Sequence, residues 1–388
     1  MPPSTATAEA PDKPRDYDTA PPHSYGLITP RFWHGMLPQH FVPLVLRNGC
    51  RVSLRGAIAS TTAFGAGCFH LLGAVSQQLI HGKRIARGKL SAPPLFVLGH
   101  WRSGTTLLHE LLIRDPSHTY ATTYECFAPH HFLTSEDWFP KLVPWLLPKK
   151  RPMDNMAAGW DRPQEDEFAL CSLGLPTPYR SWAFPQHGPV EGDWLTLENL
   201  TDAERKRWGA ALDTFVRAIA VRRPGRMVLK SPPHTARVKT LLEVFPDARF
   251  VHIARDPHSL FPSTVRLWRT LSQVQGLQRP QEHYDWIEEE VLSNLVKMYD
   301  AYERDHRLIP EGRLVEIRYE DLIESPKGKL REVYDQLGLT TFDQAEAPLD
   351  AHLASQRDYR TNRFVVPDDV RELVADRWGA YSERFGYA

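Results

Sequence analysis

The chain has 388 residues, of which 42% are hydrophobic and 24% are charged, as in an ordinary soluble globular protein. Its 47 Lys plus Arg balance its 47 Asp plus Glu, and this balance argues against a protein whose main work is to coat nucleic acid. Four widely spaced cysteines without a CxxC pair favour neither a disulfide scaffold nor a zinc ribbon. We therefore expect a reducing compartment, the cytoplasm, and either one large α/β domain with insertions or two domains.

The first 22 residues are predicted to form a disordered tail. Pro, Ala, Thr and Asp dominate residues 1–22, and the segment has neither an apolar core nor an early basic cluster. A secretory signal peptide needs both of these features, so the sequence does not indicate one.

Residues 23–90 are predicted to form a helical N-terminal region that includes one apolar segment. Residues 56–80 contain no Asp, Glu, Lys or Arg, and basic residues flank them on both sides: Arg51, Arg55, Lys83, Arg84 and Arg87. A spanning helix needs roughly 20 predominantly apolar residues, and the Ser, Thr, His and Gln residues here make a span the least favoured interpretation. We expect an amphipathic helix packed on the domain, with a helix lying on the membrane surface as the alternative.

From residue 91 to the C-terminus the pattern alternates between strand and helix. Short apolar runs typical of buried parallel strands occupy residues 94–99, 227–229, 249–254 and 313–317. Helical periodicity covers residues 105–114, 235–245, 259–271, 284–308, 330–337 and 368–385. This alternation predicts a three-layer α/β fold whose central parallel sheet is flanked by helices. Proline-rich residues 139–189 are expected to form long irregular surface loops, within a Pro- and Trp-rich insertion around residues 127–200.

The loop after the first predicted strand has the spacing of a phosphate-binding loop. It reads GHWRSGTT over residues 99–106, close to the GxxxxGK[ST] pattern, and it opens a helix whose N-terminus favours an anion. The lysine position of that pattern is Thr105 here, and the fixed charge is Arg102, which can bind an anion through two parallel N–H bonds. Because ATP chemistry needs the missing lysine at the phosphates, ATP hydrolysis is poorly supported.

This loop resembles the 5′-phosphosulfate loop of sulfotransferases that use 3′-phosphoadenosine 5′-phosphosulfate (PAPS). Trp101 stands where that family usually has proline. The resemblance implies a P-loop-like fold in which five consecutive residues hold the 5′-phosphosulfate: Arg102, Ser103, Gly104, Thr105 and Thr106.

Two further segments resemble the same family. Residues 249–268 carry an arginine and a serine eight residues apart, Arg255 and Ser263, which the resemblance implies on the 3′-phosphate. Tyr319 begins a YEDL segment whose tyrosine approaches the adenine in the family. Late in the chain a basic loop is implied to close over the nucleotide, through either Arg357 or Arg360.

The catalytic groups are predicted from context and from the resemblance. Glu125 matches the glutamate base of the branch that includes tyrosylprotein and glycan sulfotransferases, and His130 and His131 are rival bases. Lys230 ends a predicted strand, where a buried lysine needs an anionic partner. The resemblance implies that Lys230, with Arg102, stabilises the sulfonate in the transition state. The acidic run at residues 163–167 is read as a solvated helix N-terminus rather than as an acceptor site.

Together these motifs predict a PAPS-dependent O-sulfotransferase that acts on a hydroxyl of a carbohydrate, lipid or small molecule. No metal is required in principle, because the leaving phosphate is held by arginine and backbone N–H groups. We expect no nucleic-acid partner, and a possible peripheral membrane contact through residues 56–80. The alternatives are a P-loop kinase and a non-catalytic, membrane-associated nucleotide-binding protein.

Overall fold

A computed structural model of the chain describes residues 25–26, 29–148, 158–279, 285–356 and 366–388. The predicted tail over residues 1–22 lies outside the described residues, and so do both candidate closing residues, Arg357 and Arg360.

A central sheet of five parallel strands has the order β2-β3-β1-β4-β5. The strands are β1 (Leu95–Leu98), β2 (His118–Tyr120), β3 (Arg226–Lys230), β4 (Arg249–Ala254) and β5 (Leu314–Arg318). Leu95 aligns with Val228 on one side and with Arg249 on the other, which places β1 at the centre of the sheet. The predicted parallel sheet is confirmed. Sequence patterns miss β2, because a three-residue edge strand is too short to show a period.

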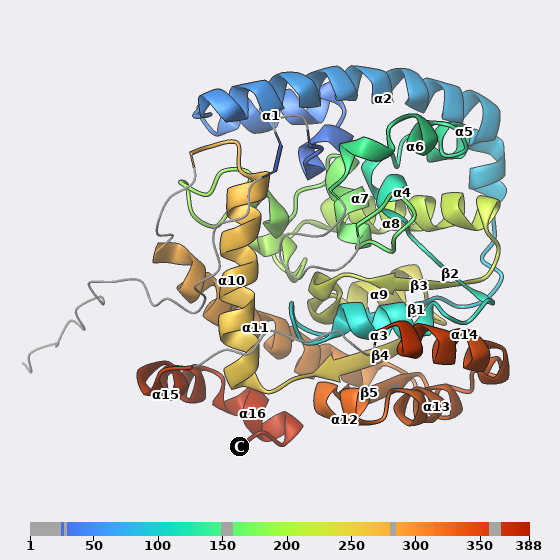
Figure 1. Ribbon diagram of the computed structural model, residues 1–388, viewed down its shortest axis with the longest axis vertical. Coiled ribbons are helices and arrows are strands. Elements are labelled where there is room, and N and C mark those ends of the chain that lie inside the picture. The colour runs from blue at the N-terminus through green and yellow to red at the C-terminus, as the bar shows by residue number, and fades with distance from the viewer. Residues whose placement is uncertain (1–24, 27–28, 149–157, 280–284, 357–365) are drawn as a thin grey trace, which may run out of the picture.

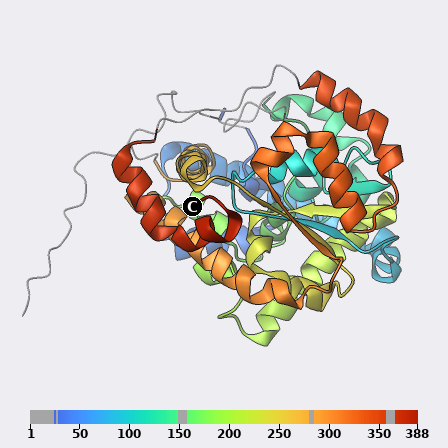
Figure 2. The ribbon, with the colours of Figure 1, turned by 90° about the horizontal axis from the view of Figure 1, so that it is seen from below.

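Helices cover both faces of the sheet, so the predicted three-layer architecture is also confirmed (Figures 1 and 2). Leu95 and Val97 face one layer, and Phe96 and Leu98 face the other. The first layer contains α3 (Thr105–Leu112), α12 (Tyr319–Glu324), α13 (Pro326–Gln336) and α14 (Phe342–Ser355). The second contains α8 (Asp202–Arg222), η5 (Pro232–Ala236), α9 (Val238–Val244), α10 (Pro257–Gln275), α11 (Asp285–Asp305) and η6 (His306–Leu308).

The C-terminal region forms two helices rather than the single helix predicted over residues 368–385. These are α15 (Asp368–Arg377) and α16 (Gly379–Phe385). The break falls at Trp378, whose fully buried indole donates to the Leu292 carbonyl of α11 at 3.1 Å. Burial of this large side chain outweighs the local helical periodicity.

The N-terminal region adds a further helical layer, with η1 (Phe32–Gly35), α1 (Pro38–Arg47) and the long helix α2 (Leu54–Arg87). In Figure 1, α2 runs along the outer edge of the molecule, away from the sheet. The predicted helix over residues 56–80 is therefore confirmed and is longer at both ends.

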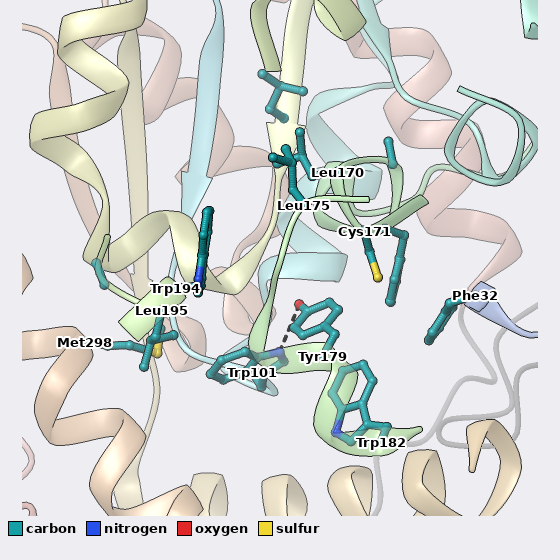
Figure 3. Packing of buried hydrophobic residues seen from close by; sticks show 14 of the residues in the cluster. Phe32, Trp101, Leu170, Cys171, Leu175, Tyr179, Trp182, Trp194, Leu195 and Met298 are labelled. Atoms are coloured by element: carbon teal, nitrogen blue, oxygen red, sulfur yellow. Dashed lines mark hydrogen bonds between the residues drawn. The ribbon is translucent and has the colours of Figure 1, made fainter. Parts of the chain in front are cut away.

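Within the described residues of the insertion, the predicted loops alternate with short helical segments. After α4 (Thr123–Phe127) these are α5 (Phe132–Ser135), α6 (Phe139–Leu142), η2 (Pro144–Leu146), α7 (Asp166–Ser172), η3 (Pro178–Trp182) and η4 (Gly192–Trp194). Tyr179, Trp182 and Phe184 are fully buried in the larger hydrophobic core (Figure 3 shows the first two). The proline content fixes short turns between these elements, while the aromatic residues supply the buried surface.

Candidate functional site

The predicted site residues follow four neighbouring strands of the sheet. Lys230 ends β3, residues 99–104 follow β1, Arg255 follows β4 and Tyr319 follows β5. Since these strands are parallel and adjacent, their carboxyl ends share one edge of the sheet, where such folds bind ligands.

The loop between β1 and α3 has a backbone that two glycines make possible. Gly99 and Gly104 have φ angles of 145° and 105°. A Cβ atom on Gly99 would lie 2.6 Å from the Ile253 carbonyl oxygen, and one on Gly104 would collide with the ring of Tyr319. Arg102 itself has a φ of 69°, a left-handed conformation that is unfavourable for a residue with a side chain. This strain marks the loop as a functional segment.

Neighbouring side chains hold the loop in this shape. The Gly99 N–H donates to the Thr235 hydroxyl at 2.7 Å, and the Thr264 hydroxyl donates to the Trp101 carbonyl at 3.1 Å. Ser103 donates its hydroxyl inside the loop, to the carbonyl three residues earlier. Gly104 then caps α3, whose first turn is formed by Thr105, Thr106 and Leu107. The N–H groups of such a turn have no partner within the helix and are available to an anion.

Arg102 and Arg255 lie side by side, as a single nucleotide site requires. The Arg102 Nε donates to the Ser263 hydroxyl at 3.0 Å, and the Arg255 Nη1 donates to the Arg102 carbonyl at 2.9 Å. The Arg255 guanidinium also lies 4.4 Å from the ring centroid of Tyr319, within the range of a cation–π contact. Residues predicted from three separate segments are thus brought together.

The sequence did not predict the hydrogen bonds that hold the backbone of Arg255 in place. The Tyr381 hydroxyl on α16 accepts from the Arg255 N–H and donates to the Arg255 carbonyl, both at 2.9 Å. Glu320 accepts from the Asp256 N–H at 3.2 Å and from the Tyr387 hydroxyl at 2.6 Å. Nothing in the local sequence signals these contacts, since α16 lies more than 120 residues after β4.

Lys230 is buried, and its partner is Glu165. The two side chains are 2.7 Å apart, between Nζ and Oε1. The other Glu165 oxygen accepts from the Tyr179 hydroxyl at 2.5 Å, and that hydroxyl accepts from the Trp101 indole at 3.1 Å (Figure 3 shows the second bond). Burial, reinforced by the Glu165 charge, raises the pKa of Tyr179 well above its ordinary value, so the hydroxyl stays protonated and donates. A continuous network therefore joins Lys230 to the phosphate loop.

The acidic run that begins α7 is buried and paired, so its interpretation as a solvated helix N-terminus is wrong. Asp166 accepts from the His234 Nε2 at 2.6 Å and from the Ser231 hydroxyl at 3.0 Å. Glu167 binds Arg237 at 2.6 Å, and both side chains are almost completely inaccessible to solvent. These partners all follow β3, so the acidic run fixes the segment that carries Lys230.

Replacing Glu167 with alanine should lower the free energy of unfolding by about 3–5 kcal/mol, because it leaves the buried Arg237 charge without its partner. Urea denaturation measures this loss. The matched control is Glu289→Ala, which removes an exposed pair with Arg377 at 2.7 Å and should cost less than about 1 kcal/mol. Equal losses in the two variants would contradict the structural role of Glu167.

Glu125, the predicted base, lies at the N-terminus of α4 with its side chain fully buried. Its Oε2 accepts from the Thr122 N–H at 2.7 Å, and both carboxylate oxygens lie 2.8 Å from the Arg223 Nη2. The Glu125 carboxylate therefore caps the N-terminus of α4 and forms an ion pair with Arg223. The catalytic role of Glu125 stays a prediction, and Glu165 is a rival that the sequence reasoning did not consider.

The rival histidines are engaged elsewhere. His131 contacts the Ser135 hydroxyl through Nδ1 at 2.7 Å and His70 of α2 through Nε2 at 2.6 Å. The His130 Nε2 lies 3.1 Å from the Ser172 carbonyl of α7. Burial lowers the pKa of both imidazoles to about 4. With both ring nitrogens of His131 occupied and His130 held against α7, neither is favoured as the base.

Comparison with known proteins agrees with this geometry. The sequence pattern of the sulfotransferase family matches residues 93–344. The chain is 43% identical to the omega-hydroxy-beta-dihydromenaquinone-9 sulfotransferase Stf3 of Mycobacterium bovis, over 80% of this chain and 79% of that protein. The protein of the same name from Mycobacterium tuberculosis matches with the same identity and coverage.

Two solved structures share the fold at low sequence identity. Sulfotransferase STF9 from Mycobacterium avium has a TM-score of 0.67 and 20% identity, over 90% of this chain and 97% of that one. Sulfotransferase STF1 from Mycobacterium tuberculosis has a TM-score of 0.59 and 17% identity, over 88% of this chain and 92% of that one. The family match and the identity to Stf3, on a fold with the phosphate loop at its expected strand end, establish that the chain belongs to the sulfotransferase family.

Proposed function

We propose that this enzyme transfers the sulfuryl group of PAPS to a hydroxyl on an apolar, lipid-like acceptor. The observation that carries the donor is the direct contact between the two arginine segments, Arg102 after β1 and Arg255 after β4. One nucleotide with phosphates at both ends of its ribose can bind two such groups at once. The acceptor class is supported by the identity to proteins named as menaquinone sulfotransferases.

The donor would be held at both ends. Arg102 and the N–H groups at the start of α3 bind the 5′-phosphosulfate, with Ser103, Gly104, Thr105 and Thr106 forming the loop. Arg255 and Ser263 bind the 3′-phosphate, and the Tyr319 ring lies against the Arg255 guanidinium. This arrangement distinguishes PAPS from ATP by the position of its phosphate rather than by a metal.

The transfer step needs a base and a positive charge near the reacting sulfur. As the acceptor oxygen forms its bond to sulfur, the bond between sulfur and the bridging phosphate oxygen breaks, and the hydroxyl proton moves to a carboxylate. Lys230 supplies the charge that stabilises the sulfonate and the leaving oxygen. We assign the base to Glu165 rather than to Glu125, because Glu165 keeps 14% of its side-chain surface exposed whereas Glu125 is fully buried. The Glu165 carboxylate also lies 2.7 Å from Lys230 and is joined through Tyr179 to Trp101 of the phosphate loop.

Aromatic side chains pack beside the phosphate loop. Trp101 contacts Tyr179 with ring centroids 6.1 Å apart, and Tyr179 contacts Phe168 at 5.1 Å. Phe168 stacks on Phe32 of η1 at 3.8 Å, beneath α2. Figure 3 shows Trp101, Tyr179 and Phe32 in succession. These rings are almost inaccessible to solvent, so they form the apolar core behind the phosphate loop, and the acceptor class rests on the identity to the menaquinone sulfotransferases.

Radiolabelled sulfate from PAPS should enter a prenylated quinol bearing a hydroxyl in preference to a free sugar. By calorimetry, PAP should bind at least about tenfold more tightly than ATP, since one charge-assisted contact to the 3′-phosphate is worth more than 1.4 kcal/mol. Tighter binding of ATP would favour the kinase alternative. Binding of PAP without transfer to any acceptor would favour the non-catalytic alternative.

A further inference from the structure

The outer face of α2 is apolar, and its inner face is built from small residues. Gly56, Ala59, Ala63 and Gly67 are buried against the domain. The large apolar side chains point outward: Leu54, Ile58, Phe64, Leu72, Val75 and Leu79 are all exposed, Leu79 by 81%. In a soluble protein a surface helix normally turns its large apolar residues toward the core. Here that orientation is reversed.

Neighbouring elements extend this apolar surface. Val42 and Leu46 of α1 are exposed, and a groove of about 300 Å³ separates α1 from α2. Trp138 is exposed by 44% and its ring lies 6.4 Å from Phe69 of α2, and Trp145 of η2, a few residues further along the chain, is exposed by 64%. Tryptophan with one exposed edge is typical of membrane–water interfaces, where its apolar ring and polar N–H meet different surroundings.

The charge contributed by α1 and α2 is entirely positive, whereas Glu136 and Asp137, which precede Trp138, pair with Arg222. The sequence contains no Asp or Glu between Asp18 and Glu110. Six exposed basic residues lie at the two ends of α2 and the adjoining turn: Arg47, Arg51, Arg55, Lys83, Arg84 and Arg87. An apolar stripe with basic ends is complementary to a bilayer that carries anionic headgroups.

The packing of α2 favours a position parallel to the membrane plane. By length and composition α2 is able to cross a bilayer. Both of its ends, however, are bonded to the same domain: the Ser53 N–H donates to the Leu277 carbonyl at 2.9 Å, and Arg217 donates to the Gly88 carbonyl at 2.6 Å. A span would break both contacts and would pull the ends to opposite sides of the bilayer.

We infer that α1, α2, α6 and η2 form a membrane-docking surface, on which α2 lies in the headgroup region of an anionic bilayer. This inference rests on the surface alone and does not depend on the proposed acceptor. It gives the enzyme access to substrates dissolved in the membrane, because α2 and η1 pack in the core layer that also contains Trp101 of the phosphate loop.

Co-flotation of the full chain with vesicles tests this inference. The protein should float with vesicles of phosphatidylcholine and phosphatidylglycerol, float less with phosphatidylcholine alone, and be released by high salt. Leu72→Ser combined with Leu79→Ser should lower partitioning by roughly a hundredfold or more, because both substitutions remove apolar surface that the bilayer would bury. Lys83→Ala with Arg87→Ala should lower it mainly on anionic vesicles.

The matched control is Ile323→Ser, which changes an exposed isoleucine on α12, outside this surface; it should leave flotation unchanged. The midpoint of thermal unfolding and the affinity for PAP, measured by calorimetry, should be the same in all variants. A variant that loses flotation but keeps both values has lost membrane binding and not the nucleotide site of the proposed reaction. Two results would overturn the inference. The first is no flotation with anionic vesicles. The second is that the protein forms a stable dimer, that the leucine substitutions convert it to a monomer, and that neither dimer nor monomer binds the vesicles.

Discussion

Glu165→Gln is expected to lower kcat by about 10²- to 10⁴-fold while PAP affinity stays within a fewfold of the parent, because the change removes the base and leaves the donor site intact. Glutamine keeps the size of the side chain, and its single carbonyl oxygen can still accept from either the Tyr179 hydroxyl or Lys230. Steady-state sulfate transfer measures kcat, and calorimetry measures PAP binding.

The matched control for this prediction is Glu125→Gln, at the other candidate base. Its carboxylate caps α4 and binds Arg223, so the substitution should reduce thermal stability and change kcat by less than about tenfold. The opposite result, a large loss of kcat in Glu125→Gln and a small one in Glu165→Gln, would return the base assignment to Glu125. Comparable large losses in two folded variants would contradict the exclusive role proposed for Glu165.

Arg255→Ala should weaken PAP binding by about 10²-fold, since a charge-assisted contact to phosphate contributes roughly 2–3 kcal/mol. Adenosine 5′-phosphosulfate lacks the 3′-phosphate, so its affinity should fall much less. The comparison of the two ligands is necessary because Arg255 also contacts Tyr319 and the Arg102 carbonyl. General damage to the loop would weaken both ligands equally, and that outcome would refute the assignment.

Arg249→Ala is the control from the same strand. Arg249 begins β4 and donates to the Gly338 carbonyl at 3.3 Å, whereas Arg255 follows the other end of the strand. Because ligands bind at the carboxyl edge of a parallel sheet, the loss of Arg249 should leave the affinities for both nucleotides unchanged.

Trp101 links the two halves of the proposed mechanism. The sequence shows only that tryptophan replaces the proline usual at this loop position. In the structure its indole donates to Tyr179, which in turn donates to Glu165. These two hydrogen bonds join the phosphate loop to the proposed base. A displacement of the loop should therefore change the position of the Glu165 carboxylate, and a displacement of Glu165 should change the loop.

Much of the donor site was predictable from the sequence. The strands that carry Arg102, Lys230, Arg255 and Tyr319 are visible as apolar runs, and the motifs follow them directly. Parallel strands place their carboxyl ends at one edge, so a list of strand-end residues already predicts a cluster. The contact of Arg102 with Ser263 and Arg255 agrees with that prediction.

The tertiary structure alone decided which carboxylates face the site and which face of α2 is covered. Glu165 pairs with Lys230 because the N-terminus of α7 packs against the end of β3. The two residues are 65 positions apart, so the local sequence around either one does not predict the pair. The sequence predicts a helix over residues 56–80 without charged side chains, but the burial of the glycine and alanine face of α2 depends on how closely the domain approaches it. Local patterns determine strands, loops and their order; long-range packing determines the partner of each buried charge, because desolvation makes only one pairing stable.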